Sequence, residues 1–99
     1  MNMNRKKVFI SQPMFNKSNK QILQERLIII KKLKELNFDI IDSVLTGSIE
    51  KSPIEYLAES IKLMSDADIV YMMRGWQKAR GCKIEHEVAC CYGKDIYYE

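Results

Sequence analysis

The feature that most constrains this sequence is a nearly unbroken apolar run, DIVYMM, at residues 68–73. A strand exposed on one face alternates apolar and polar side chains, whereas a strand covered on both faces is apolar throughout. We therefore expect residues 68–73 to form a central strand of a parallel sheet with helices on both faces. The polar, glycine-containing segment 74–81 would then follow at the carboxyl edge of the sheet, where open α/β folds bind ligands.

Three further segments have the composition of strands. KVFIS at residues 7–11 is rich in β-branched and aromatic side chains, and it ends before Pro13, which a central strand would not tolerate. FDIIDSV at residues 38–44 and DIYY at residues 95–98 have a similar composition. The sequence thus predicts four strands separated by longer stretches.

Helices are expected in the three connecting stretches. Apolar residues recur with helical period over residues 19–36, with lysines on the other side. Ser52-Pro53-Ile54-Glu55 combines an N-cap serine, a proline at the first helical position and a glutamate at the third, so a helix should begin there and end near residues 65–66. The last helix should end before Gly93. The predicted buried stripes are Ile22, Leu23, Leu27, Ile29, Ile30, Leu33 and Leu36, then Ile54, Leu57, Ala58, Ile61 and Met64, then Ile84, Val88 and Cys91.

Strands and helices therefore alternate along the whole chain, with crossovers long enough for parallel pairing. Right-handed crossovers predict an α/β fold, a flavodoxin-like open parallel sheet of four strands in the order 2-1-3-4 with three helices, as an α-β-α sandwich. Ninety-nine residues suffice for one domain spanning positions 1–99. Because four strands leave much surface uncovered, we expect a homodimer or a higher homo-oligomer.

Composition excludes several classes of protein. No apolar run is long enough to cross a bilayer and the N-terminus lacks a cleavage site, so we expect a cytoplasmic protein without membrane contact. The net charge of +3 suits a small anion better than a long nucleic acid. The odd number of cysteines suggests a reducing compartment. Cys82, His86 and Cys90 share a helix face, but one face cannot surround a tetrahedral ion, so we expect neither a metal nor a cofactor.

Glu85 is the candidate catalytic residue. We expect it in the first turn of the last helix, near unpaired backbone N–H groups and close in sequence to Arg80 and Lys83, so that its anionic form is favoured. An ionised carboxylate beside a loop with a tight turn at Gly75 and an aromatic side chain at Trp76 has the elements of a nucleophile in a binding pocket. Alternatively, Glu85 only complements the helix dipole, and Trp76 anchors a core or an interface instead of stacking on a base.

Residues after the first two strands are candidates for ligand contact. Ser11 ends the first strand and Gln12 and Met14 follow it, at the predicted carboxyl edge. Alternatively, this segment serves only as a connector. Asp42, at the end of the second strand, either hydrogen-bonds a sugar hydroxyl or forms a turn.

Several segments together resemble one protein family. They are residues 7–14, Ile41-Asp42-Ser43, Gly75-Trp76, residues 79–87 and residues 89–93. Across essentially the whole chain, this pattern is similar to the nucleoside 2-deoxyribosyltransferase-like superfamily, and most of all to a small branch of uncharacterised bacterial and phage domains of the DUF4406 type. The similarity to the transferases themselves is narrower: a glutamate followed four residues later by alanine and then by Gly-Lys, met here by Glu85, Ala89, Gly93 and Lys94.

In those relatives, the glutamate attacks the anomeric carbon of a 2-deoxyribonucleoside, expels the base and holds the sugar as an ester until a second base or water takes it. The resemblance implies that Glu85 is the nucleophile and that a nucleoside or nucleotide is the ligand. It also implies that Ser11, Gln12, Pro13 and Met14 lie against the sugar or its 5′ substituent, and that Gly81 allows close approach of the backbone.

The sequence also departs from the transferases. Gln12 stands where the wider group usually has glycine, and no clear equivalent exists of the aspartates that handle the leaving base. Arg74, Lys78 and Arg80 instead suggest that the ligand carries phosphate. Two main functions therefore remain open: N-glycosidic bond cleavage or 2-deoxyribosyl transfer through Glu85, and binding or sequestering of a nucleotide without chemistry. A third is a phage accessory domain that contacts another protein.

Overall fold

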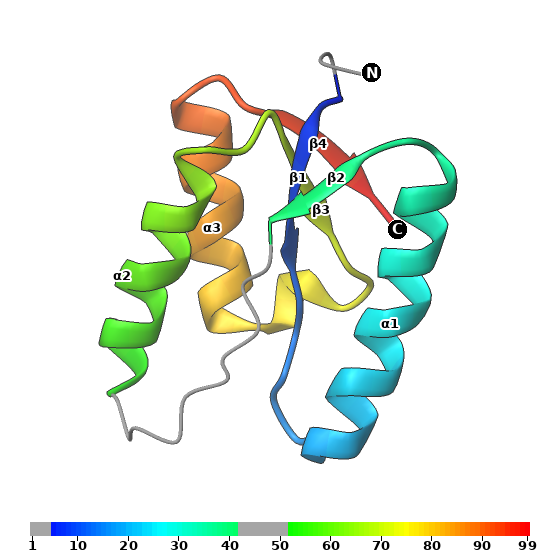
Figure 1. The fold of residues 1–99 in the computed structure, drawn as a ribbon. Coiled ribbons are helices and arrows are strands. Elements are labelled where there is room, and N and C mark those ends of the chain that lie inside the picture. Colours follow the sequence, from blue (N-terminus) through cyan, green and yellow to red (C-terminus); the bar gives the residue numbers. More distant parts are fainter. Residues whose placement is uncertain (1–4, 42–51) are drawn as a thin grey trace.

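The computed structural model describes residues 5–41 and 52–99, which form an open parallel sheet with helices on both faces (Figure 1). The strands pair in the order β2-β1-β3-β4, all in parallel, so the predicted fold class and strand order are confirmed. The elements are β1 (Lys7–Ser11), α1 (Asn19–Glu35), β2 (Asp39–Ile41), α2 (Pro53–Met64), β3 (Ile69–Met72), the 3-10 helix η1 (Trp76–Lys78), α3 (Arg80–Cys91) and β4 (Asp95–Tyr98).

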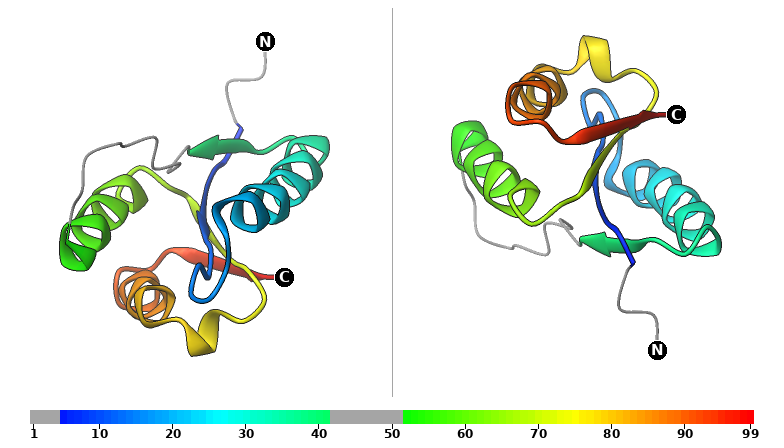
Figure 2. Two further views of the ribbon diagram at one scale, coloured as in Figure 1. Left: turned by 90° about the horizontal axis from the view of Figure 1, so that it is seen from below. Right: turned by 90° about the horizontal axis from the view of Figure 1, so that it is seen from above.

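The core consists of two layers, one on each face of the sheet. Helix α1 covers one face, and α2 and α3 cover the other (Figure 2). Every residue of β3 is buried, which confirms the prediction of a central strand. Because successive side chains of a strand point to opposite faces, each central strand contributes to both layers. The first layer contains Val8, Ile10, Ile29, Leu33, Ile69, Tyr71 and Met73, and the second contains Phe9, Met64, Ala67, Val70, Met72, Ala79, Cys82 and Ala89.

Two predicted helix ends are confirmed by their hydrogen bonds. At the start of α2, the Ser52 hydroxyl accepts from the Glu55 N–H, and the Glu55 carboxylate accepts from the Ser52 N–H, which forms a capping box. After α3, Gly93 has φ of 72°, and the N–H of Lys94 donates to the carbonyl of Ala89 at 2.9 Å. A left-handed residue followed by this bond closes a helix, and glycine adopts that conformation at the lowest cost.

The buried face of α3 differs from the predicted one. Ile84 and Cys91 are exposed and Val88 is only partly buried, whereas Cys82, Glu85 and Ala89 are buried. These three positions follow the i, i+3, i+7 spacing of a single helix face. The predicted face was wrong because it was assigned from the most apolar side chains of the helix. In the structure, the face that packs against the sheet includes the carboxylate of Glu85.

The buried faces of α1 and α2 are narrower than predicted. In α1 only Arg26, Ile29 and Leu33 are buried, and Leu23 and Leu27 remain about half exposed. In α2, Ile54 is 74% exposed and Ala58 is also exposed. A helix that contacts only one sheet buries a stripe, so the outer apolar positions of both helices face away from the core. The expectation of a homo-oligomer stays a prediction.

The second predicted strand, residues 38–44, is only partly described. Strand β2 begins at Asp39 and is followed to Ile41, and Asp42 and Ser43 lie outside the described residues. Among the described helices, none has the length and the apolar character needed to cross a bilayer.

Candidate functional site

A cleft of about 630 Å³ lies at the carboxyl edge of the sheet. All three long helices begin at this end of the molecule (Figure 1). The loop after β1, the side of α1, the first turns of α2 and the start of α3 form its walls. The lining residues are Phe9, Ile10, Gln12, Met14, Phe15, Arg26, Pro53, Tyr56, Leu57, Ser60, Lys78, Ala79, Arg80, Gly81, Cys82 and Glu85.

Glu85 lines this cleft from α3 and is only 7% exposed. Its Oε1 accepts a hydrogen bond of 2.6 Å from Oγ of Ser11, the last residue of β1. The prediction that Glu85 lies in the first turn was wrong, because α3 begins at Arg80. Glu85 is therefore in the second turn, beyond the amide groups at the helix end.

Burial raises the pKa of Glu85 above its ordinary value, and hydrogen bonds from Ser11 and Ser60 oppose that rise. The predicted stabilisation of the anion by helix amides and neighbouring cations was therefore wrong in direction. Water is largely excluded, and removing a carboxylate from water favours its neutral form. Serine hydroxyls are the groups that stabilise the charge. Once the Glu85 carboxyl group ionises, its anion is poorly solvated, and a poorly solvated carboxylate is a better nucleophile.

Cys82 lies one turn before Glu85 and is also buried in the cleft wall. Burial raises the pKa of its thiol to about 11, the nearby Glu85 charge adds to the rise, and a hydrogen bond with Ser11 opposes it. The thiol is therefore neutral at pH 7 and is a poor nucleophile. Within residues 5–41 and 52–99, no group of three or more histidine, cysteine or acidic side chains could hold a metal ion.

The start of α3 forms a cationic part of the cleft. Lys78 and Arg80 line it with exposed side chains, and the N-cap residue Ala79 has no side chain that could accept from the first amide groups. At Gly81, a Cβ atom would meet no heavy atom within 4 Å, so the backbone here is open to close approach. Free amide groups at a helix start attract anions, and two nearby cations increase that attraction.

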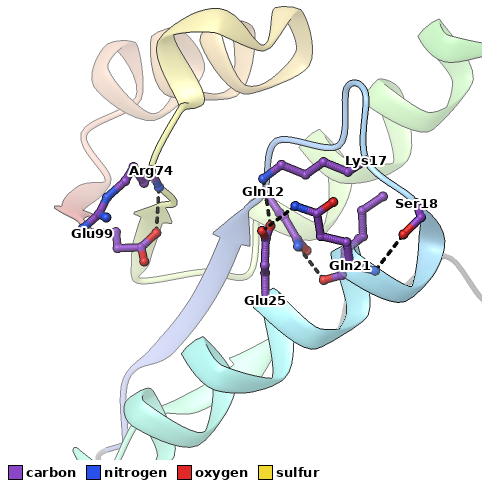
Figure 3. Close-up of polar contacts among 8 residues, drawn as sticks. Gln12, Lys17, Ser18, Gln21, Glu25, Arg74 and Glu99 are labelled. Carbon is purple, nitrogen blue, oxygen red and sulfur yellow. Dashed lines mark hydrogen bonds and ion pairs between the residues drawn. The ribbon is translucent and has the colours of Figure 1, made fainter.

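The α1 side of the cleft carries two buried polar side chains. The amide Nε2 of Gln12 donates a 2.7 Å hydrogen bond to the carbonyl of Ile22 in the first turn of α1 (Figure 3). Arg26, one turn further along, is 3% exposed and lines the cleft. Arg26 was not predicted as a site residue, although a charged residue in register with Ile29 and Leu33 on a buried stripe is an unusual signal.

The predicted site residues Pro13, Gly75 and Trp76 lie outside the cleft lining. Gly75 and Trp76 line a separate hollow of about 350 Å³, beside Tyr98. The Trp76 ring stacks on His86 with ring centroids 4.1 Å apart. Gly75 has φ of 92°, a left-handed conformation that favours glycine, whereas a Cβ here would meet the ring of Pro13 at 3.8 Å, an ordinary van der Waals contact.

The structure thus brings together six of the residues predicted as catalytic or substrate-binding. Gln12, Met14, Arg80, Gly81 and Glu85 line the cleft. Ser11 does not line it but hydrogen-bonds to Glu85. Asp42 lies outside the described residues. The aromatic side chains that do line the cleft, Phe9, Phe15 and Tyr56, were not predicted. They lie on three different elements or loops, and no short sequence motif links them.

Fold and site together define a class: small α/β domains with an open parallel sheet and a buried carboxylate in a cleft at its carboxyl edge. A family model described as "Domain of unknown function (DUF4406)" matches residues 6–98. The chain belongs to this family, which confirms the DUF4406 part of the resemblance found in its sequence. No curated protein matches the chain.

Proposed function

We propose that this domain cleaves or transfers the N-glycosidic bond of a nucleotide or deoxynucleotide, with Glu85 as nucleophile. The observation that carries the proposal is a buried glutamate facing a cleft, with Ser11 holding one of its oxygens at 2.6 Å. The resemblance of the motifs around Glu85 to the nucleoside 2-deoxyribosyltransferase-like superfamily supports the same role. A positioned carboxylate can form a covalent intermediate at a sugar carbon.

The reaction would proceed in two steps. An oxygen of ionised Glu85 bonds to the anomeric carbon while the bond to the base breaks, and the electron pair leaves with the base, which takes a proton from solvent. Water or a second base then bonds to the same carbon, and the ester electrons return to Glu85. The attacking group loses its proton to solvent. Ser11 fixes one oxygen of the carboxylate throughout.

The cations at the start of α3 favour a phosphorylated ligand. Lys78 and Arg80 line the cleft, and the helix start lacks a side-chain cap. A phosphate bound there would accept from backbone amides and from the Arg80 guanidinium. We therefore propose that nucleotides bind better than the corresponding nucleosides.

A second function, binding of a nucleotide without chemistry, is favoured by a different observation. Glu85 is the only acidic residue among the described residues that line the cleft, so none of them can serve as a separate carboxylic acid for the leaving base. The raised pKa of Glu85 also suits a neutral carboxyl group that exchanges hydrogen bonds with a ribose hydroxyl.

Base release distinguishes the two functions. Wild type and Glu85→Gln, which retains an acceptor for Ser11, would be incubated with a panel of ribonucleoside and deoxyribonucleoside monophosphates, and free base would be measured. Release by wild type alone supports the glycosidic reaction. Binding by both proteins without release supports the alternative function, and the absence of both binding and release rejects the two proposals together.

The phosphate preference has its own test. Arg80→Ala should weaken binding of a nucleoside monophosphate by about 10-fold or more and change nucleoside binding by less than about 2-fold. Lys83→Ala is the matched control, because Lys83 is exposed on the same helix and does not line the cleft. Equal losses for both ligands in Arg80→Ala would contradict the phosphate assignment.

A further inference from the structure

We propose that Gln12 and Arg26 form a second recognition surface in the cleft, named here the α1 wall. This surface takes an uncharged ligand group that both donates and accepts a hydrogen bond. The inference rests on the proposed function, since it specifies how the same cleft would select its nucleotide. Helix α1 covers one face of the sheet and α3 covers the other (Figure 2), so Glu85 and the cations at the start of α3 face the α1 wall from the opposite side of the cleft.

The orientation of the Gln12 amide is set by one hydrogen bond. Its Nε2 donates to the Ile22 carbonyl at 2.7 Å, and a carbonyl can only be an acceptor. The nitrogen therefore points to α1, and the amide oxygen takes the other position. Reversing the amide would place two acceptors against each other.

The amide oxygen of Gln12 has no hydrogen-bond partner among the described residues, although it is buried. The whole residue is only 7% exposed and forms part of the cleft lining. A buried carbonyl oxygen without a partner is costly, and most such groups in proteins are satisfied. A donor on a bound ligand would satisfy this one.

Arg26 contributes donors beside this acceptor. The Ile22 carbonyl that binds Gln12 belongs to the helical turn that ends at Arg26. The amide of Gln12, which comes from the loop after β1, and the side chain of Arg26 therefore both lie against this turn of α1 and line the cleft. The guanidinium donates and remains charged at all ordinary pH values. The two side chains therefore fit a ligand group that accepts one hydrogen bond from Arg26 and donates another to the Gln12 oxygen.

Charge argues against phosphate on the α1 wall. A phosphate bound to Arg26 would bring its oxygens close to the Gln12 carbonyl oxygen, and two acceptors repel. The phosphate has cations and free amides at the start of α3 instead. The uncharged group is then either a sugar hydroxyl or an edge of the base, both of which offer a donor beside an acceptor.

The test replaces Gln12 with methionine, which has similar length but cannot accept a strong hydrogen bond. Affinities for ribose 5-phosphate and for ribonucleoside and deoxyribonucleoside monophosphates would be measured by calorimetry in the Glu85→Gln background. Gln12→Met should raise the Kd by about 10-fold or more. Gln21→Met is the matched control, since Gln21 is exposed on α1, its side chain bonds to Glu25, and it does not line the cleft; its Kd should change by less than about 2-fold.

A second variant guards against a folding defect. Arg26→Lys retains the charge but loses the forked donors, and we expect a similar rise in Kd. Thermal unfolding of each variant shows whether it is folded. The midpoint for Gln12→Met should move by less than about 5 °C, because loss of the Ile22 bond is offset by removal of an unsatisfied oxygen.

The ligand panel identifies the group that is bound. If Gln12→Met weakens ribose 5-phosphate as well, the group is a sugar hydroxyl; if it weakens only complete nucleotides, the group is on the base. Unchanged Kd values in Gln12→Met would overturn the α1 wall even if wild type releases base. A Gln12-dependent Kd without any base release would reject the chemistry and support the wall, and no binding of any probe would reject both.

Discussion

The hydroxyl of Ser11 donates a 2.6 Å hydrogen bond to Glu85, although the two residues lie 74 positions apart in sequence. The contact forms because β1 pairs with β3, and the chain that leaves β3 turns back through η1 into α3. The end of β1 and the second turn of α3 thereby meet at the cleft. In a setting with little water, this bond orients the carboxylate and stabilises its charge.

Ser11→Ala should raise the pKa of Glu85 further, because it removes a donor that stabilises the anion. Titration of the Glu85 carboxyl carbon by NMR would measure the change without any need for turnover. Ser65→Ala is a suitable control, since Ser65 is exposed and its hydroxyl donates to the Lys62 carbonyl of the preceding helix, away from the cleft. A Glu85 pKa that stays the same or falls in Ser11→Ala would contradict this account.

The stability of wild type relative to Glu85→Gln should fall as pH rises. The folded pKa of Glu85 lies above its ordinary value of 4.5, so the folded state holds this proton more tightly than the unfolded state. The resulting stabilisation is complete below that ordinary value and is lost as pH rises through the folded pKa. Urea unfolding of both proteins between pH 4 and pH 8 would measure the difference.

Catalytic rate, if the glycosidic reaction occurs, should have the opposite pH dependence. Glu85 must ionise before it attacks, so kcat/KM should rise over the range in which relative stability falls. The pH profile of base release would give the midpoint. A rate that is highest at acid pH would instead indicate that the neutral carboxyl group is the active form.

Two glycines of the same region should respond in opposite ways to alanine. Gly93→Ala should destabilise the fold by about 1 kcal/mol, because Gly93 has a positive φ of 72°. Gly81→Ala should leave stability unchanged or increase it by up to about 1 kcal/mol, because Gly81 is helical and a Cβ there meets nothing within 4 Å. Since Gly81 lines the cleft, its variant should nevertheless bind nucleotides more weakly. Urea unfolding and calorimetry on both variants check these results.

Trp76→Phe should change nucleotide affinity by less than about 2-fold and should lower the thermal midpoint. Trp76 packs on His86 and on the core layer that contains Met72, outside the cleft lining. Removing part of a packed aromatic surface costs stability wherever it lies. A loss of nucleotide affinity of about 10-fold or more would show that Trp76 contacts the ligand after all.

Much of the architecture was predictable because it depends on local patterns. β1 and β4 have the predicted bounds, and the capping box at Ser52 and the left-handed Gly93 are where their residue types indicate. The apolar stretch around β3 required a sheet covered on both faces, and short right-handed crossovers then allow few strand orders. Each of these inferences uses residues that are neighbours along the chain.

The environment of each site residue was less predictable. The sequence correctly placed Glu85 at the carboxyl edge of the sheet. Its burial and its raised pKa, however, depend on where α3 begins and on which face of α3 packs against the sheet. Arg26 was assigned to no role because lysines and arginines on a helix usually face water. Trp76 was grouped with the ligand loop, and the structure turns it toward His86 instead.

The sequence alone determined the order of elements, the parallel sheet and the identity of the carboxylate at its edge, because periodicity, capping residues and turn residues act over a few positions. Only the tertiary structure decided which groups surround that carboxylate. Ser11 from β1, Ser60 from α2 and the wall of Gln12 and Arg26 meet at the cleft through packing between segments distant in sequence. The burial of Glu85 and the pKa of its carboxyl group depend on that packing, so no single stretch of the chain encodes them.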